Sequence, residues 1–454
     1  MKNKAKCIIA ALLAVMILAA CGAPGGGMAG GTAAPGGGVA GGTAAPAAAT
    51  GDEVTVINFS HRWPNDPRNS MYYEIVALFE SRNPGFRVEM NYVINDVYKE
   101  RIRVMLSGGT LPDIFTSWSY TFAGNIARSG QVQTLDHLLV EYPILAETLI
   151  PTQLVGFTFN DRLYGLPFSM DGKIFYYNRD IFRQHGKQVP TTLDELFELL
   201  AAFAELGYDP VISAGLQNAW AVSHWQGTIV QRLIDPAILD IDTDMARGVF
   251  TDQAYIDAMN IFMRLSNYMG AAVAALPHEN ARNAFIAGDV PLFYAQFSES
   301  RFIEGTVTAA VVEGADFDFG FFNFPAIEGG LGDQGGLTGA PEGYMMSVGA
   351  VEGTSDFLRF LVSQEVGEMK IVQAGILSPI YGAISPYNAN STMLAAVDVI
   401  GGALTVPWLD NMFEASIADA FMRGGQSMII GDMTAEQLME GVQAAAAIIR
   451  DEHG

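Results

Sequence analysis

Cysteine and histidine are scarce in this sequence. The 454 residues include two cysteines, Cys7 and Cys21, and six scattered histidines. If Cys7 is removed with a leader, Cys21 has no partner for a disulfide, so the folded chain must be stabilised by packing. The pair His278-Glu279 has no second histidine at helical spacing, so we expect neither a zinc site nor another metal site.

Basic residues are also few: 25 lysines and arginines stand against 49 acidic residues, a formal net charge of −24. Such a chain repels the phosphates of nucleic acids, so we expect no nucleic-acid partner. The sequence has no Gly-x-Ser-x-Gly motif for a nucleophilic serine. Residues 330–335 match Gly-x-Gly-x-x-Gly, but no helix-forming run follows, so we expect no phosphate cradle and no cofactor.

Long hydrophobic runs are absent except at the start, where residues 8–20 follow three lysines. As a helix this run would be about 20 Å long, short of a bilayer core of about 30 Å. The pattern is typical of an export signal over residues 1–20. Its end, Leu-Ala-Ala-Cys21, resembles the bacterial lipobox, where cleavage leaves an N-terminal cysteine whose acyl chains anchor the protein. A secreted protein with an incidental Cys21 is the alternative.

Residues 22–51 are almost entirely glycine, alanine, proline and threonine, and the hexamer GGTAAP occurs at 30–35 and 41–46. A segment without large apolar side chains cannot offset the entropy lost on ordering. We therefore expect the acylated cysteine and a disordered tether over residues 21–52, with an r.m.s. reach of about 30 Å.

Strand-like and helix-like segments alternate from residue 54 onward. The predicted strands are 54–59, 86–93 and 112–118, and the predicted helices include 70–82, 96–106, 191–206 and a final helix that closes the chain. Thr192 and Glu195 form a capping-box pattern at the start of one of these helices. The alternation predicts an α/β fold with a largely parallel sheet, and the chain length suits two domains.

Six blocks follow one another along the chain: FESRNPGFRVEM (79–90), YKERIRVMLSGGTLPDIFTSW (98–118), FNDRLYGLPFSMDGKIFYYNRDIFRQHG (159–186), VPTTLDEL (189–196), NAFIAGDVPLFY (283–294) and FLRFLVSQEVGEMKIVQAGILSP (357–379). Together, behind a lipobox, they resemble the extracellular solute-binding proteins of ABC importers, especially the carbohydrate-binding branch related to maltose-binding protein. One pattern departs from the family. A stretch that usually ends in tryptophan reads PLFYAQF over 291–297, so the tryptophan often used for stacking is absent.

The resemblance implies a periplasmic-binding-protein-like fold, in which two α/β lobes are joined by a hinge and the ligand is bound in the cleft between them. Crossings between the lobes are expected near Pro167–Lys173, Phe322–Ile327 and Gly375–Pro379. The N-terminal lobe is then 53–170 plus 324–376, and the C-terminal lobe is 171–323 plus 377–454.

Eight residues are candidates for binding a carbohydrate: Trp63, Asp66, Trp118, Asp171, Trp225, Phe297, Tyr344 and Trp408. The ligand crevice of an α/β sheet lies beyond the carboxyl ends of its strands, where we expect loops at 61–69, 117–122 and 169–172. Tryptophan offers a flat face to a sugar ring, and aspartate accepts strong hydrogen bonds from hydroxyls. By the resemblance, Asp171 takes the place of an acidic ligand contact and Phe297 that of the missing tryptophan.

Each candidate has a structural alternative. A buried tryptophan usually belongs to the core, and Trp220 and Trp225 are balanced between core and site. Asp66 lies in a loop rich in proline and asparagine, where aspartate commonly forms turns.

The sequence thus predicts a monomeric, lipid-anchored receptor on the extracytoplasmic face of a bacterial cell membrane. It would bind a small carbohydrate and deliver it to the permease subunits of an ABC transporter, with no catalysis of its own. Two alternatives stay open. One is a surface-anchored carbohydrate-active enzyme with an acid pair in the cleft, and the other is the same fold with a peptide, polyamine or metal complex as cargo.

Overall fold

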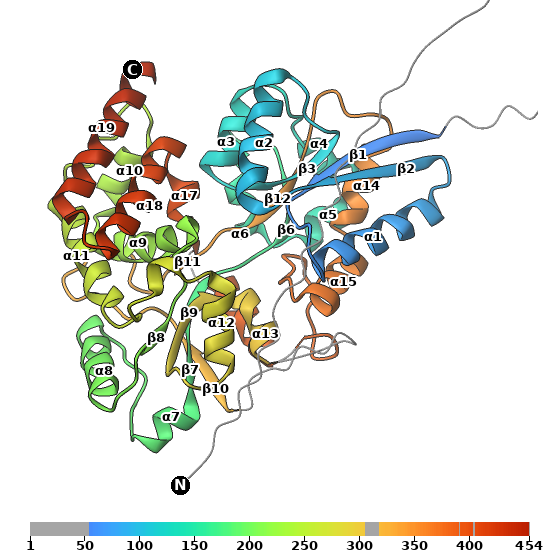
Figure 1. Cartoon of the computed structure of the whole chain (residues 1–454). Coiled ribbons are helices and arrows are strands. Elements are labelled where there is room, and N and C mark those ends of the chain that lie inside the picture. Colours follow the sequence, from blue (N-terminus) through green and yellow to red (C-terminus); the bar gives the residue numbers. More distant parts are fainter. Residues whose placement is uncertain (1–53, 305–316, 390, 403–404, 454) are drawn as a thin grey trace, which may run out of the picture. The chain divides into compact units, whose positions relative to one another are not determined.

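The computed structural model describes residues 54–304, 317–389, 391–402 and 405–453 (Figure 1). The predicted signal peptide, the candidate lipidation residue Cys21 and the predicted tether lie outside the described residues. Among the helices that are described, none combines the length and the apolar character needed to cross a membrane.

The first lobe is built on a five-stranded sheet with the order β2-β1-β3-β12-β6. Its strands are β2 (Phe86–Tyr92), β1 (Thr55–His61), β3 (Ile114–Trp118), β12 (Glu342–Met346) and β6 (Leu166–Ser169). β1 pairs in parallel with both β2 and β3, which confirms the parallel layer expected from the alternation of strands and helices. β12 returns from the second lobe and runs antiparallel to β3 and β6.

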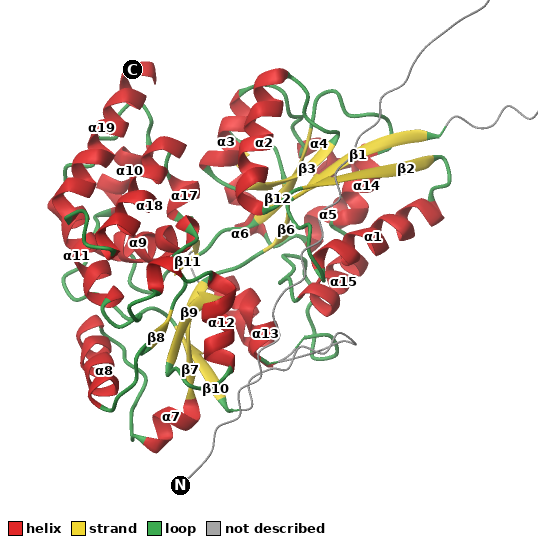
Figure 2. Cartoon of the chain, in the orientation of Figure 1, coloured by secondary structure: helices red, strands yellow, loops and turns green. Residues whose placement is uncertain are grey.

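Helices cover both faces of this sheet (Figures 1 and 2). α1 (Arg68–Arg82), α14 (Thr354–Leu361) and α15 (Gln364–Ala374) lie on one face, and α2 (Asn95–Gly108) and α3 (Thr121–Arg128) lie on the other. α1 buries Met71, Tyr72, Ile75, Val76 and Phe79, a spacing that places one stripe of the helix against the sheet.

The second lobe is built on a four-stranded sheet with the order β10-β7-β9-β8. The strands are β10 (Phe319–Phe322), β7 (Lys173–Asn178), β9 (Leu292–Gln296) and β8 (Ile212–Ser213). β7 runs antiparallel to both of its neighbours, so this sheet departs from the largely parallel pairing expected. Its main helices are α8 (Leu193–Glu205), α9 (Ala219–Leu233), α11 (Gln253–Ser266), α18 (Ala415–Ile429) and α19 (Ala435–His453).

The start of α8 confirms the capping box predicted from the sequence. The Thr192 side chain accepts a hydrogen bond from the Glu195 backbone N–H, and the Glu195 carboxylate accepts one from the Thr192 backbone N–H. The two side chains satisfy backbone donors that the first turn of a helix leaves unpaired.

Shorter elements complete the described chain. They are α4 (Asp136–Glu141), α5 (Pro143–Thr148), α6 (Pro151–Leu154), η1 (Val155–Phe157), β4 (Thr158–Phe159), β5 (Arg162–Leu163), α7 (Arg179–Gln184), α10 (Pro236–Thr243), η2 (Val273–Ala275), α12 (His278–Ile286), η3 (Phe297–Glu299), α13 (Ser300–Ile303), β11 (Leu337–Thr338), α16 (Ser391–Gly402), β13 (Thr405–Val406) and α17 (Leu409–Met412).

The chain passes directly from the first sheet to the second between Ser169 and Lys173, inside the first expected crossing. Its return to β12 comes later than the expected crossing at 322–327, because Phe324 and Ile327 still pack in the core of the second lobe. Before β12 the chain runs through β11, and there a Cβ on Gly339 would lie 2.1 Å from the backbone oxygen of Asp171. The two crossing segments are therefore in close contact. The crossing expected at 375–379 and the exact lobe limits stay predictions.

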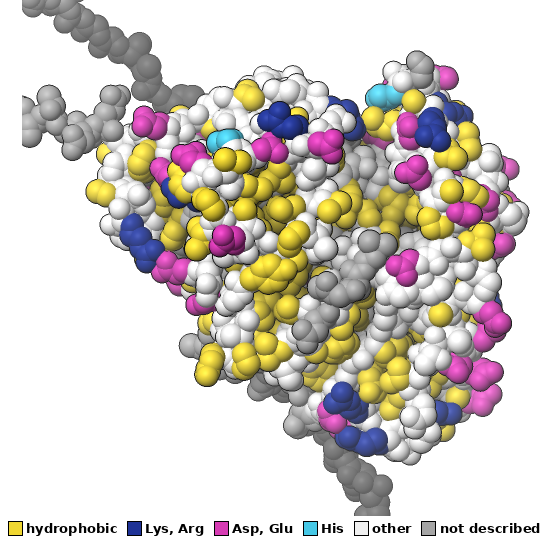
Figure 3. All heavy atoms as spheres, turned by 180° about the vertical axis from the view of Figure 1, so that it is seen from behind, with side chains coloured by type: hydrophobic (Ala, Val, Ile, Leu, Met, Phe, Trp, Pro, Cys, Tyr) yellow, Lys and Arg dark blue, Asp and Glu magenta, His cyan; other side chains and the backbone are white. Residues whose placement is uncertain are grey.

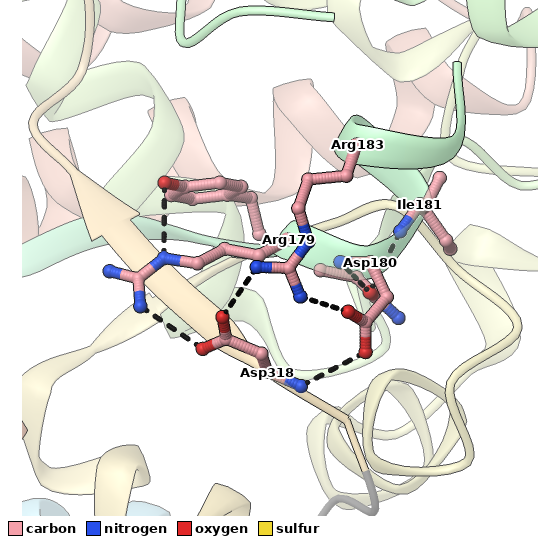
Figure 4. A network of polar contacts seen from close by, with 7 residues as sticks. Arg179, Asp180, Ile181, Arg183 and Asp318 are labelled. Atoms are coloured by element: carbon pink, nitrogen blue, oxygen red, sulfur yellow. Dashed lines mark hydrogen bonds and ion pairs between the residues drawn. The ribbon is translucent and has the colours of Figure 1, made fainter. Parts of the chain in front are cut away.

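Charged side chains on the second lobe also form a solvated network at the end of its sheet (Figure 4). Asp318, just before β10, binds Arg179 at 3.0 Å and Arg183 at 2.9 Å, and its backbone N–H donates to Asp180. All of these side chains are exposed by 44% or more, so solvent screens each pair and the network contributes little to stability. Seen from behind, acidic and basic side chains lie mainly around the edge of the molecule, and hydrophobic side chains gather across its middle (Figure 3).

Candidate functional site

The register of the first sheet places several predicted loops at one edge. Glu342, the first residue of β12, lies opposite Trp118 at the end of β3 and opposite Ser169 at the end of β6. Arg62 and Trp63 directly follow the last residue of β1. The carboxyl ends of β1, β3 and β6 therefore meet at this edge, as expected for the ligand crevice of an α/β sheet.

An arginine lies between the two tryptophans at this edge. The guanidinium carbon of Arg62 is 4.6 Å from the ring centroid of Trp63 and 4.7 Å from that of Trp118. Arg62 also forms an ion pair with Glu342. Lys99 of α2 lies over Trp118 at 4.7 Å. Cations thus cover part of the aromatic surface of Trp63 and Trp118.

Lys99 connects this edge to the second lobe. Its Nζ atom lies 2.8 Å from Asp410 Oδ2 and 3.2 Å from Asn411 Oδ1, both at α17. Asp410 also accepts a hydrogen bond from Ser223 of α9. The Lys99 and Asp410 side chains are only 18% and 10% exposed, so this pair is screened much less than the surface network.

The second lobe contributes a group of aromatic and imidazole rings. Trp408 stacks on His224 with centroids 4.1 Å apart, and Trp220 lies 5.1 Å from His224 and 5.0 Å from His278. Burial, aided by the charges of Lys173, His278 and Lys99, holds the pKa of His224 well below its usual value. His224 is therefore neutral at physiological pH, and within the described residues its buried Nδ1 atom has no hydrogen-bond partner.

Two carboxylates near this group, the buried Glu299 and the half-buried Asp171, have pKa values that are shifted in opposite directions. Burial alone would raise the pKa of Glu299, but His278 and Arg282, which contact its two oxygens at 3.1 and 3.2 Å, lower it to about 2. Asp171 accepts hydrogen bonds from the backbone N–H groups of Gly172 at 2.9 Å and Ser298 at 3.3 Å, and the Ser298 side chain also hydrogen-bonds to it. Burial outweighs these bonds and raises the pKa of Asp171 to about 6.

Lys173 lies two residues after Asp171 and is 2% exposed. Its Nζ atom is 3.4 Å from the backbone oxygen of Tyr294 and 5.9 Å from the ring centroid of Trp220. Burial lowers the pKa of Lys173 to about 7, although Glu299 and Asp171 oppose the shift.

Several titratable groups with strongly shifted pKa values in one place mark a candidate functional site. We call this group the strand-end cluster; it consists of Arg62, Trp63, Lys99, Trp118, Asp171, Lys173, Trp220, His224, His278, Glu299, Glu342, Trp408 and Asp410.

The structure places four predicted residues elsewhere. Trp225 is 2% exposed and packs on Phe175 and Tyr294 in the second core. Phe297 and Tyr344 are fully buried among other aromatic rings, and the Tyr344 hydroxyl is bonded to that of Tyr72 at 2.9 Å. Asp66 is exposed and accepts hydrogen bonds from the backbone and hydroxyl of Ser70, as a turn residue at the start of α1 does.

Residues 63–368 match the family model described as bacterial extracellular solute-binding protein. The chain belongs to this family.

Some known proteins are similar to this solute-binding protein over a short segment, and others over most of the chain. A putative binding protein of Brucella abortus is 29% identical over 140 residues, 30% of this chain and 33% of the relative. The chain thus spans about a third of the length of the first such relatives. The alpha-glucosides-binding periplasmic protein AglE of Rhizobium meliloti is 24% identical over 395 residues, 81% of this chain and 84% of AglE.

Solved structures show the same two-lobed periplasmic-binding-protein fold. A chitin oligosaccharide binding protein superposes with a TM-score of 0.77 at 21% identity, covering 88% of this chain and 100% of the other. The maltose/maltodextrin-binding domain MalE of Bdellovibrio bacteriovorus, bound to maltotriose, gives 0.66 at 16% identity, covering 87% and 99%.

Sequence reasoning did not select several members of the strand-end cluster of this solute-binding protein. Trp220 lies five residues from Trp225 on α9, about 140° around the helix, so one faces the site and the other the core. Helical spacing separates the two faces, but only the tertiary packing decides which face is buried. Lys173, His278 and Glu299 carry no local motif, and their roles follow from burial and mutual contact.

Proposed function

We propose that this solute-binding protein captures a saccharide at the strand-end cluster, between its two lobes, and delivers it to an ABC permease. One observation carries the proposal. Of the five tryptophans in the chain, the four at positions 63, 118, 220 and 408 belong to this one cluster, together with buried polar groups. Aromatic faces beside hydrogen-bonding carboxylates suit the alternating C–H and hydroxyl surfaces of a sugar ring.

The similar proteins support the same cargo class. Their names describe binding of alpha-glucosides, chitin oligosaccharides, raffinose and maltotriose. We infer that the ligand contacts are Trp63, Trp118, Trp220 and Trp408 for stacking and Asp171 for hydroxyl groups. The lipobox at Cys21 supports attachment of the receptor to the outer side of the cell membrane.

The carbohydrate-active enzyme is the less well supported alternative. Glu299 and Asp171 have pKa values pushed apart, as an acid and base pair would. However, His278 and Arg282 occupy both oxygens of Glu299, which leaves it poorly suited to attack a sugar or activate water. The family consists of binding proteins.

Differential scanning fluorimetry of the purified full chain against neutral mono- and oligosaccharides tests the proposal. A saccharide at 100 times its dissociation constant should stabilise the protein by about 2.7 kcal/mol. Chromatography of the mixture after prolonged incubation should return the saccharide unchanged. Stabilisation by peptides or polyamines alone would identify a different cargo, and loss of the saccharide would identify an enzyme.

A further inference from the structure

Two arginines near the strand-end cluster form no ion pair with an acidic side chain among the described residues. Arg301 of α13 is 8% exposed, and its Nη1 atom has no hydrogen-bond partner in the part of the chain that the structure describes. Arg68, at the start of α1, is half-buried, and its guanidinium lies over the Trp63 ring at 5.4 Å. Among the described residues Arg68 makes no ion pair.

Two other buried cations among the described residues, Arg232 and Lys370, donate hydrogen bonds to oxygen atoms of the chain. Arg232 is fully buried, but it donates to Asn323 Oδ1 and to the backbone oxygens of Phe324 and Gly336 at 3.0–3.2 Å. Lys370 is 1% exposed and donates to a backbone oxygen at 2.7 Å; burial lowers its pKa, and a lysine relieves burial by losing its proton. An arginine keeps its charge when it is buried, and a buried charge is unfavourable unless it is paired. An anion bound next to Arg301 would provide that pairing.

Both arginines border the strand-end cluster. Arg301 follows η3, whose residues Ser298 and Glu299 contact Asp171 and His278. The positive charge of Arg68 is near enough to add to burial, the larger cause, in lowering the pKa of Arg301. Burial is the main cause that lowers the pKa of Arg68, the charge of Arg62 adds to it, and the carboxylates of Glu342, Glu299 and Asp171 oppose the shift.

The other charges of the cluster are largely matched. Arg62 pairs with Glu342, Lys99 with Asp410, and Arg282 with Glu299. Asp171 and Lys173 have opposite charges and lie two residues apart. Arg68 and Arg301 are left as a local excess of positive charge, in a chain whose formal net charge is −24.

We propose that Arg68 and Arg301 form an anion subsite beside the strand-end cluster, and that the cargo is a saccharide carrying an anionic group. This proposal rests on the proposed function and narrows its substrate class. The guanidinium fork binds carboxylate and phosphate oxygens in the same bidentate geometry, so the group is the carboxylate of a uronic acid or the phosphate of a sugar phosphate. The site also explains how an acidic protein holds an acidic ligand.

The test measures how glucuronate, glucose 6-phosphate and glucose bind to the full chain at constant ionic strength. The melting temperature is recorded as each probe is titrated, for the wild type and for R68Q, R301Q and R301K. R423Q is the control, because Arg423 is exposed and pairs with Asp419 on its own helix. We expect at least one anionic probe to bind tenfold or more tightly than glucose. R68Q and R301Q should lose this preference, R301K should keep part of it, and R423Q all of it.

Each outcome bears on the proposal. Preference for glucuronate alone identifies a uronic acid, preference for glucose 6-phosphate alone identifies a sugar phosphate, and preference for both indicates recognition of charge. No preference over glucose, or an equal preference in R68Q and wild type, overturns the subsite. Binding of neutral oligosaccharides by the wild type, with no preference for either anionic probe, would refute the subsite and leave the proposed function intact. Failure of every saccharide, neutral or anionic, would refute both.

Discussion

At the scale of single residues, Asp171 combines three properties of a ligand contact. It lies in the crossing between the lobes, it is partly buried, and its carboxylate forms no ion pair within the described part of the chain. A carboxylate in such surroundings is unfavourable until hydroxyl groups or a cation satisfy it. Burial lowers the pKa of the neighbouring Lys173 to about 7, so the charge of this lysine changes near neutral pH.

Asp171→Asn should change both the pH dependence of stability and the affinity. Because the pKa of Asp171 is raised from 3.8 to about 6 in the folded protein, the folded state holds a proton that the unfolded state releases. Stability of the ligand-free wild type should therefore fall as pH rises from about 4 to about 6. D171N should remove this fall and weaken saccharide binding at pH 7 about ten- to a hundredfold. Melting curves and calorimetry check this, with the exposed Asp66→Asn as control; identical pH profiles of D171N and wild type would contradict it.

Trp220→Ala and Trp225→Ala should have opposite effects. Trp220 lies beside Lys173, His224 and His278, so its removal should weaken saccharide binding about tenfold with a small change in melting temperature. Trp225 fills the second core, so its removal should lower the free energy of unfolding by about 3–5 kcal/mol. Equal losses of affinity in the two variants, after correction for unfolded protein, would argue against this assignment.

At the scale of elements, the sequence predicts what depends on local pattern. The strands near 54–59, 86–93 and 112–118 appear as β1, β2 and β3, because alternation and turn residues define each one locally. The position of Glu342 beside Trp118 is not predictable in this way, because it depends on β12 pairing with a strand far away in the sequence. The same holds for Arg301 and Lys173, whose burial arises only from tertiary packing.

The contact between α2 and α17 gives an element-scale prediction. Lys99→Met removes a shielded ion pair that connects the two lobes while keeping the length of the side chain. We expect saccharide affinity to fall about tenfold. The charged hydrogen bond between Lys99 and Asp410 stabilises the arrangement in which both lobes contact the ligand, and K99M removes it. Small-angle scattering should show a larger radius of gyration for K99M than for wild type without ligand. Arg103→Met is the matched control, since Arg103 forms its ion pair with Glu100 on its own helix and otherwise lies over Phe122 of the same lobe. The same radius in K99M and wild type would count against the contact as a link between the lobes.

At the scale of the whole molecule, the folded body, the tether and the leader have separate roles in the account. In the proposed function, the folded body selects the ligand, and the predicted acyl chains on Cys21 keep the receptor at the membrane where a permease operates. The chain has 49 acidic against 25 basic residues, and on the face that Figure 3 shows its charged side chains lie mainly around the edge, in contact with solvent.

Cys21→Ala should release the protein from the membrane. The leader is too short to span a bilayer, so the predicted acyl chains are the anchor. In cell fractionation the wild type should remain with the membranes, and C21A should move to the soluble extracytoplasmic fraction with unchanged saccharide affinity. Cys7→Ala serves as control, because Cys7 lies in the predicted signal peptide. Retention of C21A in the membrane fraction would rule out the lipobox interpretation.

The central claim is reversible capture of a saccharide by the folded body, and calorimetric titration tests it most directly. The full chain is titrated with the saccharide that raises its melting temperature most, and the ligand is then recovered and analysed. We predict saturation at one saccharide per chain and recovery of the ligand unchanged. Absence of binding by every saccharide, or conversion of the saccharide into products, would contradict the account.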